Sequence, residues 1–299
     1  MRIRILAVAA LLSPLALPVA AADAATEAAT EASTAPVSGA VFYRFTTKAD
    51  IYRYLGGKFT KTSVGGLGQF SASPDGRKVA WVDQDSRLHV TEGRSDKVVA
   101  KNAIFGAPCA TPVWSADSKR LAYPMTGTEA TAPISVVNAD GTGLKKVGRT
   151  YGVCHLAWSA NGRYLAGYTG TTEGVHLLDV TTGKTRKAAG IKLANHVQSL
   201  SPDGRKVIIR AIKPSDPGGD GAWPTWFRPT VVDTVTGAKL TIPVRGTLIG
   251  AIYLSDGRLA VRVKGATRNT VVVLSKTLKP VQRFAEPASV RAMGLLQLL

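Results

Sequence analysis

The sequence is poor in acidic residues, in cysteine and, beyond its first 24 residues, in long apolar runs. Its 20 acidic residues stand against 38 Lys and Arg, which leaves a formal net charge of +18. The two cysteines and four histidines lack the short fixed spacing of a zinc motif. No later segment has the roughly 18 uninterrupted apolar residues of a membrane-spanning helix. Helical periodicity is also absent there, so the sequence predicts an all-β fold.

Residues 1–24 have the three parts of a secretory signal peptide. Arg2 and Arg4 form a basic start, an apolar stretch follows, and small residues at 22–24 provide a cleavage site. A membrane anchor is the alternative, and two prolines within the apolar stretch disfavour it. Residues 25–37 are rich in Ala, Thr, Ser and Glu and predict a disordered leader. We therefore expect a secreted or extracytoplasmic protein of the cell envelope.

One turn motif recurs along the rest of the chain. Ser-Pro-Asp-Gly occurs at residues 73–76 and 201–204, and related turns occur at 115–118, 159–162 and 255–257. An apolar run flanks each copy on both sides, as in a β-turn between two strands, where Pro and Gly supply the required φ angles. The intervals between copies are 42, 44, 42 and 53 residues. A period in the low forties is typical of four-stranded propeller blades.

The repeats predict a six-bladed β-propeller of four-stranded blades over residues 38–299. The first blade has three strands of its own at 38–63 and lacks an innermost strand. The uncharged segment 292–299 resembles the first strands of other blades, and we expect it to pair with the N-terminal blade and close the ring. The predicted blades are 38–63 with 287–299, then 64–105, 106–149, 150–192, 193–245 and 246–286.

The turns, together with Asp-x-x-Thr-Gly hairpins at 179–183 and 233–237, resemble the PD40 (WD40-like) repeats of TolB-type propellers. The resemblance covers residues 38–299 and implies the fold rather than one activity. It also implies an envelope role, because TolB is a periplasmic protein whose propeller binds a peptidoglycan-associated lipoprotein. TolB has an α/β domain before its propeller, and we find no counterpart in this sequence. Propellers of related peptidases add a hydrolase domain, whereas this sequence has no Gly-x-Ser-x-Gly motif.

The two cysteines precede the first strands of neighbouring blades. Cys109 lies five residues before Trp114, and Cys154 lies four before Trp158. In an exported protein this placement predicts a disulfide at the mouth of the central channel. Two free thiols and a metal site are the alternatives.

Three polar residues are predicted at the same mouth. His155 follows the second cysteine directly, and Asn195 and His196 occupy the corresponding place in the fifth blade. A Cys/His cluster is able to bind a soft metal, but the spacing here does not match a zinc motif. We therefore expect these residues to contribute to a binding surface, with no metal and no cofactor. His89 and His176 lie on predicted third strands, and we expect them to be structural.

The longest interval contains an insertion at residues 213–229. It begins with Pro and Gly and ends with Trp223, Trp226, Phe227 and Arg228. Propeller topology places this loop at the channel mouth, on the face of the two cysteines. Aromatic side chains on a loop either pack down or form a recognition surface. Two interpretations therefore stay open, namely that they cover the edge of blade five or that they bind a sugar ring, a base or an acidic peptide.

The basic composition favours an acidic or polyanionic partner, although a lysine-rich surface also serves solubility alone. Without Arg2, Arg4 and Asp23 the net charge is +17, and no nucleic-acid motif is present, so we expect no specific nucleic acid.

The leading hypothesis is a monomeric, non-catalytic, exported propeller that binds a partner protein or an anionic cell-envelope polymer through the mouth. The alternative is a small hydrolase or lyase that uses the central channel, but we find no catalytic residues that topology brings together.

Overall fold

The computed structural model describes residues 35–127, 131–218 and 221–299. The expected signal peptide, most of the expected leader, and Asp220 of the insertion therefore lie outside the described residues. The chain divides into two units, Met1–Ala35 and Pro36–Leu299, and the second contains all of the described strands.

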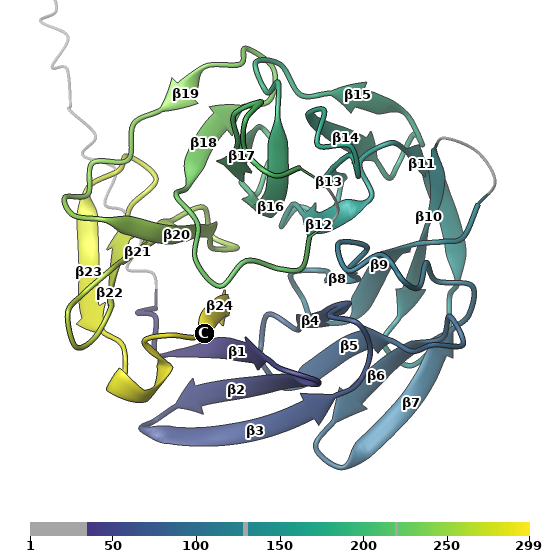
Figure 1. The fold of residues 1–299 in the computed structure, drawn as a ribbon, viewed down its shortest axis with the longest axis horizontal. Coiled ribbons are helices and arrows are strands. Elements are labelled where there is room, and N and C mark those ends of the chain that lie inside the picture. Colours follow the sequence, from purple (N-terminus) through teal and green to yellow (C-terminus); the bar gives the residue numbers. More distant parts are fainter. Residues whose placement is uncertain (1–34, 128–130, 219–220) are drawn as a thin grey trace, which may run out of the picture. The chain divides into compact units, whose positions relative to one another are not determined.

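The second unit consists of six antiparallel four-stranded sheets that form the blades of a propeller (Figure 1). The predicted all-β, six-bladed fold is confirmed. The sheets of blades one to three contain β24 with β1 to β3, then β4 to β7, then β8 to β11. Their bounds are β1 (Gly39–Phe45), β2 (Ala49–Leu55), β3 (Lys58–Val64), β4 (Phe70–Ala72), β5 (Lys78–Val82), β6 (Leu88–Glu92), β7 (Ser95–Ala100), β8 (Val113–Trp114), β9 (Arg120–Pro124), β10 (Ala132–Asn138) and β11 (Lys145–Thr150).

Blades four to six contain β12 to β15, β16 to β19 and β20 to β23, each in sequence order from the inner to the outer strand. The 3-10 helix η1 (Ala288–Val290) leads into the closing strand, β24 (Gly294–Leu298). The other bounds are β12 (Cys154–Trp158), β13 (Tyr164–Tyr168), β14 (Val175–Asp179), β15 (Thr185–Lys187), β16 (Ala194–Leu200), β17 (Lys206–Ala211), β18 (Thr230–Asp233), β19 (Lys239–Leu240), β20 (Leu248–Tyr253), β21 (Leu259–Val263), β22 (Thr270–Leu274) and β23 (Pro280–Ala285).

The repeated turns join the inner strand of a blade to its second strand, and their own side chains hold them. Oγ of Ser73 donates a hydrogen bond to Oδ1 of Asp75, which also accepts the backbone N–H of Arg77. The backbone N–H of Lys78 donates to Oγ of Ser73 at 2.9 Å. The turn at 201–206 repeats all three hydrogen bonds. The acidic side chains of these two turns therefore serve the turns themselves.

The ring is closed by β24, which pairs antiparallel with β1. The backbone N–H of Leu299 donates to the carbonyl of Gly39, and the carbonyl of Leu299 accepts the N–H groups of Ser38 and Gly39. The predicted closure by the C-terminal segment is thus confirmed. Pairing satisfies two strand edges that would otherwise be open to association with other chains.

Val37, which the sequence places in the disordered leader, packs against blade six. Its side chain is buried, and its backbone N–H donates to Oε1 of Gln282 on β23 at 2.9 Å. Nε2 of Gln282 donates in return to the carbonyl of Val37 at 2.8 Å. Because both backbone groups are paired, Val37 is part of the propeller.

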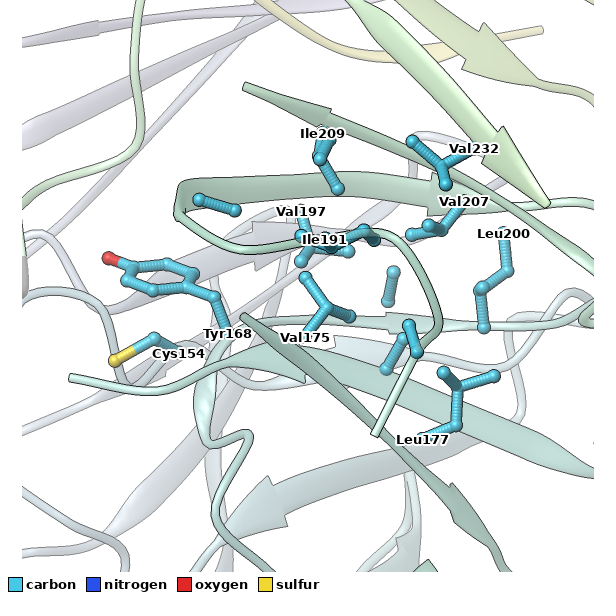
Figure 2. Packing of buried hydrophobic residues seen from close by; sticks show 14 of the residues in the cluster. Cys154, Tyr168, Val175, Leu177, Ile191, Val197, Leu200, Val207, Ile209 and Val232 are labelled. Carbon is cyan, nitrogen blue, oxygen red and sulfur yellow. The ribbon is translucent and has the colours of Figure 1, made fainter. Parts of the chain in front are cut away.

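The hydrophobic core lies between neighbouring blades. Figure 2 shows Val175 of β14, Val197 of β16 and Ile209 of β17 together between the sheets of blades four and five. All three side chains are fully buried or nearly so. β-branched residues suit this position because they pack well on a pleated surface. Full burial of one such side chain contributes about 1.5–3 kcal/mol.

A buried ion pair connects blade six to the segment that enters β24. The guanidinium of Arg262 on β21 donates two hydrogen bonds of 2.7 Å to the carboxylate of Glu286, and both side chains are about 1% exposed. Nη1 of Arg262 also donates to the carbonyl of Met293 at 2.7 Å. Nδ2 of Asn269 donates to the carbonyl of Arg291 at 2.9 Å. Because both carbonyls lie just before β24, these side chains position the closing strand.

The outermost strand of every blade carries exposed basic residues. An outer strand has one unpaired edge, and charged side chains on it oppose edge-to-edge association. Part of the positive charge therefore has a role that needs no ligand. The exposed cations on outer strands are Lys58, Lys61, Lys97, Lys145, Lys146, Arg186, Lys187, Lys239 and Arg283.

Within the described ranges, no helix is long and apolar enough to cross a membrane.

Candidate binding site at the channel mouth

The antiparallel order of each blade places two kinds of connection at one end of the propeller. These are the segments that enter the inner strands and the loops between second and third strands, and we call this end the mouth face. The repeated turns lie at the opposite end. In Figure 1 the connection between β17 and β18, which is the predicted insertion, runs across the middle of the ring.

The predicted disulfide between Cys109 and Cys154 is confirmed. Their Cα atoms are 4.6 Å apart, and both residues are buried. Cys109 lies in the segment that enters β8, and Cys154 is the first residue of β12. The backbone N–H of His155 donates to the carbonyl of Cys109 at 2.7 Å. The backbone of His155 has a φ of 45°, a left-handed conformation that residues other than glycine seldom adopt. The disulfide and this hydrogen bond together hold the backbone that orients the His155 ring.

His155 and His196 form a buried pair between blades four and five. Nδ1 of one ring lies 2.8 Å from Nδ1 of the other, and both side chains are fully buried. Nε2 of His196 lies 2.8 Å from Oε1 of Gln198. Because that oxygen only accepts, His196 carries its proton on Nε2 and accepts through Nδ1. His155 therefore donates from Nδ1 and keeps a lone pair on Nε2.

Both imidazoles are held in the neutral form. Burial, followed by the neighbouring His196, lowers the pKa of His155 well below 6.5, and the backbone of Gly221 acts weakly in the opposite direction. Burial also lowers the pKa of His196 to about 3, with Gln198 opposing the shift and Arg210 adding to it. Desolvation disfavours the charged form of a histidine, so the pair stays uncharged at neutral pH.

The aromatic end of the insertion lies over this pair. We call residues 221–229 the strap. The ring centroid of Trp223 lies 4.9 Å from that of His155 and 4.6 Å from that of His196. The ring of Phe227 lies 4.8 Å from His196, edge to face. The strap therefore covers the histidine pair with two aromatic side chains, an arrangement that excludes water from the pair.

The strap is anchored to blades one and six as well as to blade five. Oη of Tyr43 on β1 donates to the carbonyl of Trp223 at 2.6 Å. The backbone N–H of Phe227 donates to the carbonyl of Ile249 on β20 at 3.2 Å. Nζ of Lys264 lies 5.1 Å from the ring centroid of Trp226, within cation–π distance. The aromatics thus bridge the channel mouth, while Phe227 also shares a buried cluster with Ile208 and Val231 of blade five.

The space beneath the strap is small. A cavity of about 10 Å³, room for one water molecule, lies inside the ring. The side chains around the cavity include Gln198, Thr225, Phe227, Ile249, Arg262 and Leu295.

The outward surface of the strap is partly apolar and partly cationic. Trp226 is half-buried against Lys264, and Arg228 is exposed. Ala222 is also exposed, and its Cβ lies 3.9 Å from the position that a side chain on Gly68 would take. The ring of Phe45 is 4.0 Å from the same position. Phe45 and Ala222 therefore both lie close to Gly68.

The structure brings together four of the seven predicted binding residues, namely His155, His196, Trp223 and Phe227. On the same strap Trp226 is half-buried, with its indole nitrogen buried, and Arg228 is exposed. Asn195 sits at a β-bulge where β16 pairs with β17, and its side-chain oxygen makes no hydrogen bond with a described residue.

Two partners of the cluster were not predicted. Gln198 stands two residues after His196, so it shares a strand face with it, and that alternation was the available signal. Tyr43 reaches the strap from blade one, and no sequence pattern relates the two. In the part of the chain that the structure describes, no group of three or more His, Cys, Asp or Glu is placed to hold a metal ion.

Comparison with known proteins supports the fold. No protein-family model matches the chain. The Tol-Pal system protein TolB of Francisella tularensis subsp. tularensis is 37% identical over 59 residues, which are 19% of this chain and 14% of that protein. The match thus spans about a seventh of the relative's length.

Two solved structures show the same architecture. TolB from Acinetobacter baumannii aligns with a TM-score of 0.53 and 11% identity over 87% of this chain and 67% of that chain. A chain of a nidogen/laminin complex aligns with a TM-score of 0.50 and 10% identity, over 87% of this chain and 97% of that one. The resemblance to TolB-type propellers that the repeats indicate is confirmed, and the fold is that of a TolB-like β-propeller.

Proposed function

We propose that this protein is an exported, non-catalytic propeller that binds a partner protein through the mouth face. The observation that carries the proposal is the surface around the strap. On the mouth face Phe45 and Leu67 are 40% and 49% exposed, and the strap adds the half-buried Trp226 and the exposed Arg228. Aromatic and arginine side chains dominate the energy of protein interfaces, and clustered apolar groups mark such interfaces.

Export is supported by two observations. The first 24 residues have the pattern of a signal peptide. The Cys109–Cys154 disulfide is typical of proteins that fold in an oxidising compartment. The repeats resemble those of TolB, and one match by sequence is a Tol-Pal system protein, which favours the cell envelope as the site of action.

A partner protein is favoured over an anionic polymer by the apolar part of the surface. A polyanion binds through charge alone, so it would bind the exposed Lys and Arg of the outer strands as well as it binds the mouth face. Charge-driven binding weakens steeply with salt, whereas binding through a desolvated aromatic cluster is much less sensitive. Salt dependence therefore separates the two classes of partner.

The test is affinity capture from the envelope fraction with the purified full chain, at low and at high salt. The captured protein is then identified and purified, and its dissociation constant is measured for wild type and for the variant Trp226→Ala/Arg228→Ala. We expect binding to weaken at least about 10-fold, which is about 1.4 kcal/mol. The matched control is Phe59→Ala/Arg77→Ala, which removes one exposed aromatic and one exposed arginine away from the mouth. If the wild type and the strap variant bind the partner with equal affinity, the strap is not part of the interface.

A further inference from the structure

The strap covers two ionisable side chains, and no carboxylate of a described residue acts on either of them. His155 and His196 are fully buried beneath Trp223 and Phe227. Buried charges in proteins are normally paired, because an unpaired charge in the interior costs several kcal/mol. The pair is therefore compatible with the closed strap only while both rings are neutral.

The hydrogen-bond order leaves one proton-accepting position open. With Nε2 of His196 donating to Gln198, the proton between the two rings lies on Nδ1 of His155. Nε2 of His155 is buried and makes no hydrogen bond of acceptable geometry with a described residue. It is thus the first site for an added proton. The second proton must go to Nδ1 of His196, which then faces the N–H of the first ring at 2.8 Å.

The surroundings oppose the charged form. Tyr168 of β13 lies 5.4 Å from His155 between ring centroids. Arg210 of β17 lowers the pKa of His196, and Tyr43 of β1 reaches the strap from the other side, where burial raises its own pKa. Among the described residues, Tyr168 and Arg210 are the ionisable neighbours that contact the pair or shift its pKa, and neither stabilises an imidazolium. Gln198 and the backbone of Gly221 favour the charged forms, but burial outweighs both.

We propose that the His155–His196 pair is an acid-sensitive clasp, such that uptake of protons by the pair releases residues 221–229 from the channel mouth. In the closed state the buried rings resist protonation. In the open state water solvates the rings, so they take up protons more readily. A proton that binds the open state more tightly than the closed state shifts the equilibrium toward opening. Opening would uncover the channel and break the outward surface on which the proposed partner binds.

The direction and size follow from linkage. Both folded-state pKa values are depressed, so the closed state is favoured above the ordinary histidine pKa of about 6.5 and loses that advantage as pH falls below it. If both rings regain ordinary values on opening, the opening constant rises several hundred-fold, on the order of 500, between pH 7 and pH 5. Carboxylates contribute little in this window, because their ordinary pKa values are about 4.

The experiment is hydrogen–deuterium exchange of the strap in the full chain, without a partner, from pH 7.5 to pH 5. Rates are corrected for the intrinsic pH dependence of amide exchange. We expect the opening constant of residues 222–228 to rise with falling pH at a slope that approaches two protons per opening. The variant His155→Asn/His196→Asn keeps hydrogen-bonding side chains at both positions, but these side chains cannot titrate. In this variant the dependence of the opening constant on pH should vanish. The matched control is His176→Asn, a histidine on β14 outside the pair, which should keep the wild-type slope.

Two results would overturn the proposal. One is a strap whose corrected opening constant is the same at pH 7 and pH 5. The other is a full pH dependence that survives in the double variant. If that variant does not fold, the single variants decide, since each should lose about one proton of the dependence and an unchanged slope in both contradicts the clasp. The inference rests on the proposed function only for its consequence, because strap opening is measured without a partner and a missing partner leaves this result intact.

Discussion

Arg262 and Glu286 are joined by two hydrogen bonds of 2.7 Å inside the propeller, where both side chains are about 1% exposed. The same guanidinium holds the carbonyl of Met293 at 2.7 Å, one residue before the closing strand begins. An interaction that looks like a local ion pair therefore also fixes the last strand of the ring.

Replacement of Arg262 by Ala should destabilise the propeller by about 3–5 kcal/mol, because it leaves the carboxylate of Glu286 buried and unpaired. Urea unfolding of the variant measures the loss. Arg205→Ala is the control, since Arg205 also pairs with a carboxylate, that of Asp233, but at an exposed position. Exposed pairs contribute little, so the control should unfold like wild type. Equal stability of Arg262→Ala and wild type would contradict the role in closure.

Removal of the disulfide by Cys109→Ala/Cys154→Ala should lower stability by about 4 kcal/mol, the chain-entropy value for a separation of 45 residues. Thermal unfolding with and without a reductant provides the measurement. A reductant should lower the melting temperature of wild type toward that of the variant and leave the variant unchanged. A variant that remains sensitive to the reductant would show that the bond is not the source of the difference.

Gly294→Ala should weaken both ring closure and the strap. A Cβ at this position would overlap the ring of Tyr43, whose hydroxyl holds the carbonyl of Trp223. The ring sits in a packed core and has little room to move, so we expect a loss of about 1–3 kcal/mol, typical of overpacking. We also expect faster amide exchange in residues 222–228. Gly170→Ala is the control, since a Cβ there meets nothing within 4 Å.

Asp83→Asn should destabilise the protein at pH 7 and have little effect near pH 2. Burial alone would raise the pKa of Asp83, but the backbone N–H of Arg87 and the side chains of His89 and Arg87 outweigh it and lower the pKa to about 2. A carboxylate with a depressed pKa stabilises the fold above its unfolded pKa of about 3.9, and this contribution disappears as pH falls through the folded value. We expect a difference of about 2 kcal/mol at pH 7. Urea unfolding at pH 7, 5, 3 and 2 measures how this difference declines. Asp85→Asn, on the same loop but exposed, is the control.

The fold was predictable because each repeat encodes its own turn. The Ser and Asp side chains of 73–76 and 201–204 bond within the turn, so the same letters recur wherever the same geometry is needed. The disulfide and the closing strand were predictable from that spacing, since they depend on which ends of the blades lie at the same face.

The path of the strap was not predictable, because it depends on contacts between blades that are far apart in sequence. The hydrogen bond from Tyr43 to Trp223 joins blade one to an insertion in blade five, and neither residue has a pattern that points to the other. The pairing of Arg262 with Glu286 was not predictable for the same reason. Neither residue belongs to the repeated turn motif, so no pattern in the sequence relates the two. The contact of Trp223 with His155 of blade four was likewise not predictable, because the sequence relates the insertion only to blade five.

The closing strand has a consequence for the order in which the molecule is assembled. β1 leaves the ribosome well before its partner β24, because five blades separate the two strands in the sequence. Until residues 294–298 have emerged, one edge of β1 stays unpaired next to the apolar face of an unfinished blade. Such an edge is where unfinished chains associate wrongly, so the growing protein needs shielding until the final segment arrives. A chain cut short before Gly294 would keep that open edge permanently. Proteases would then have to recognise the one unfinished blade in order to degrade the truncated chain.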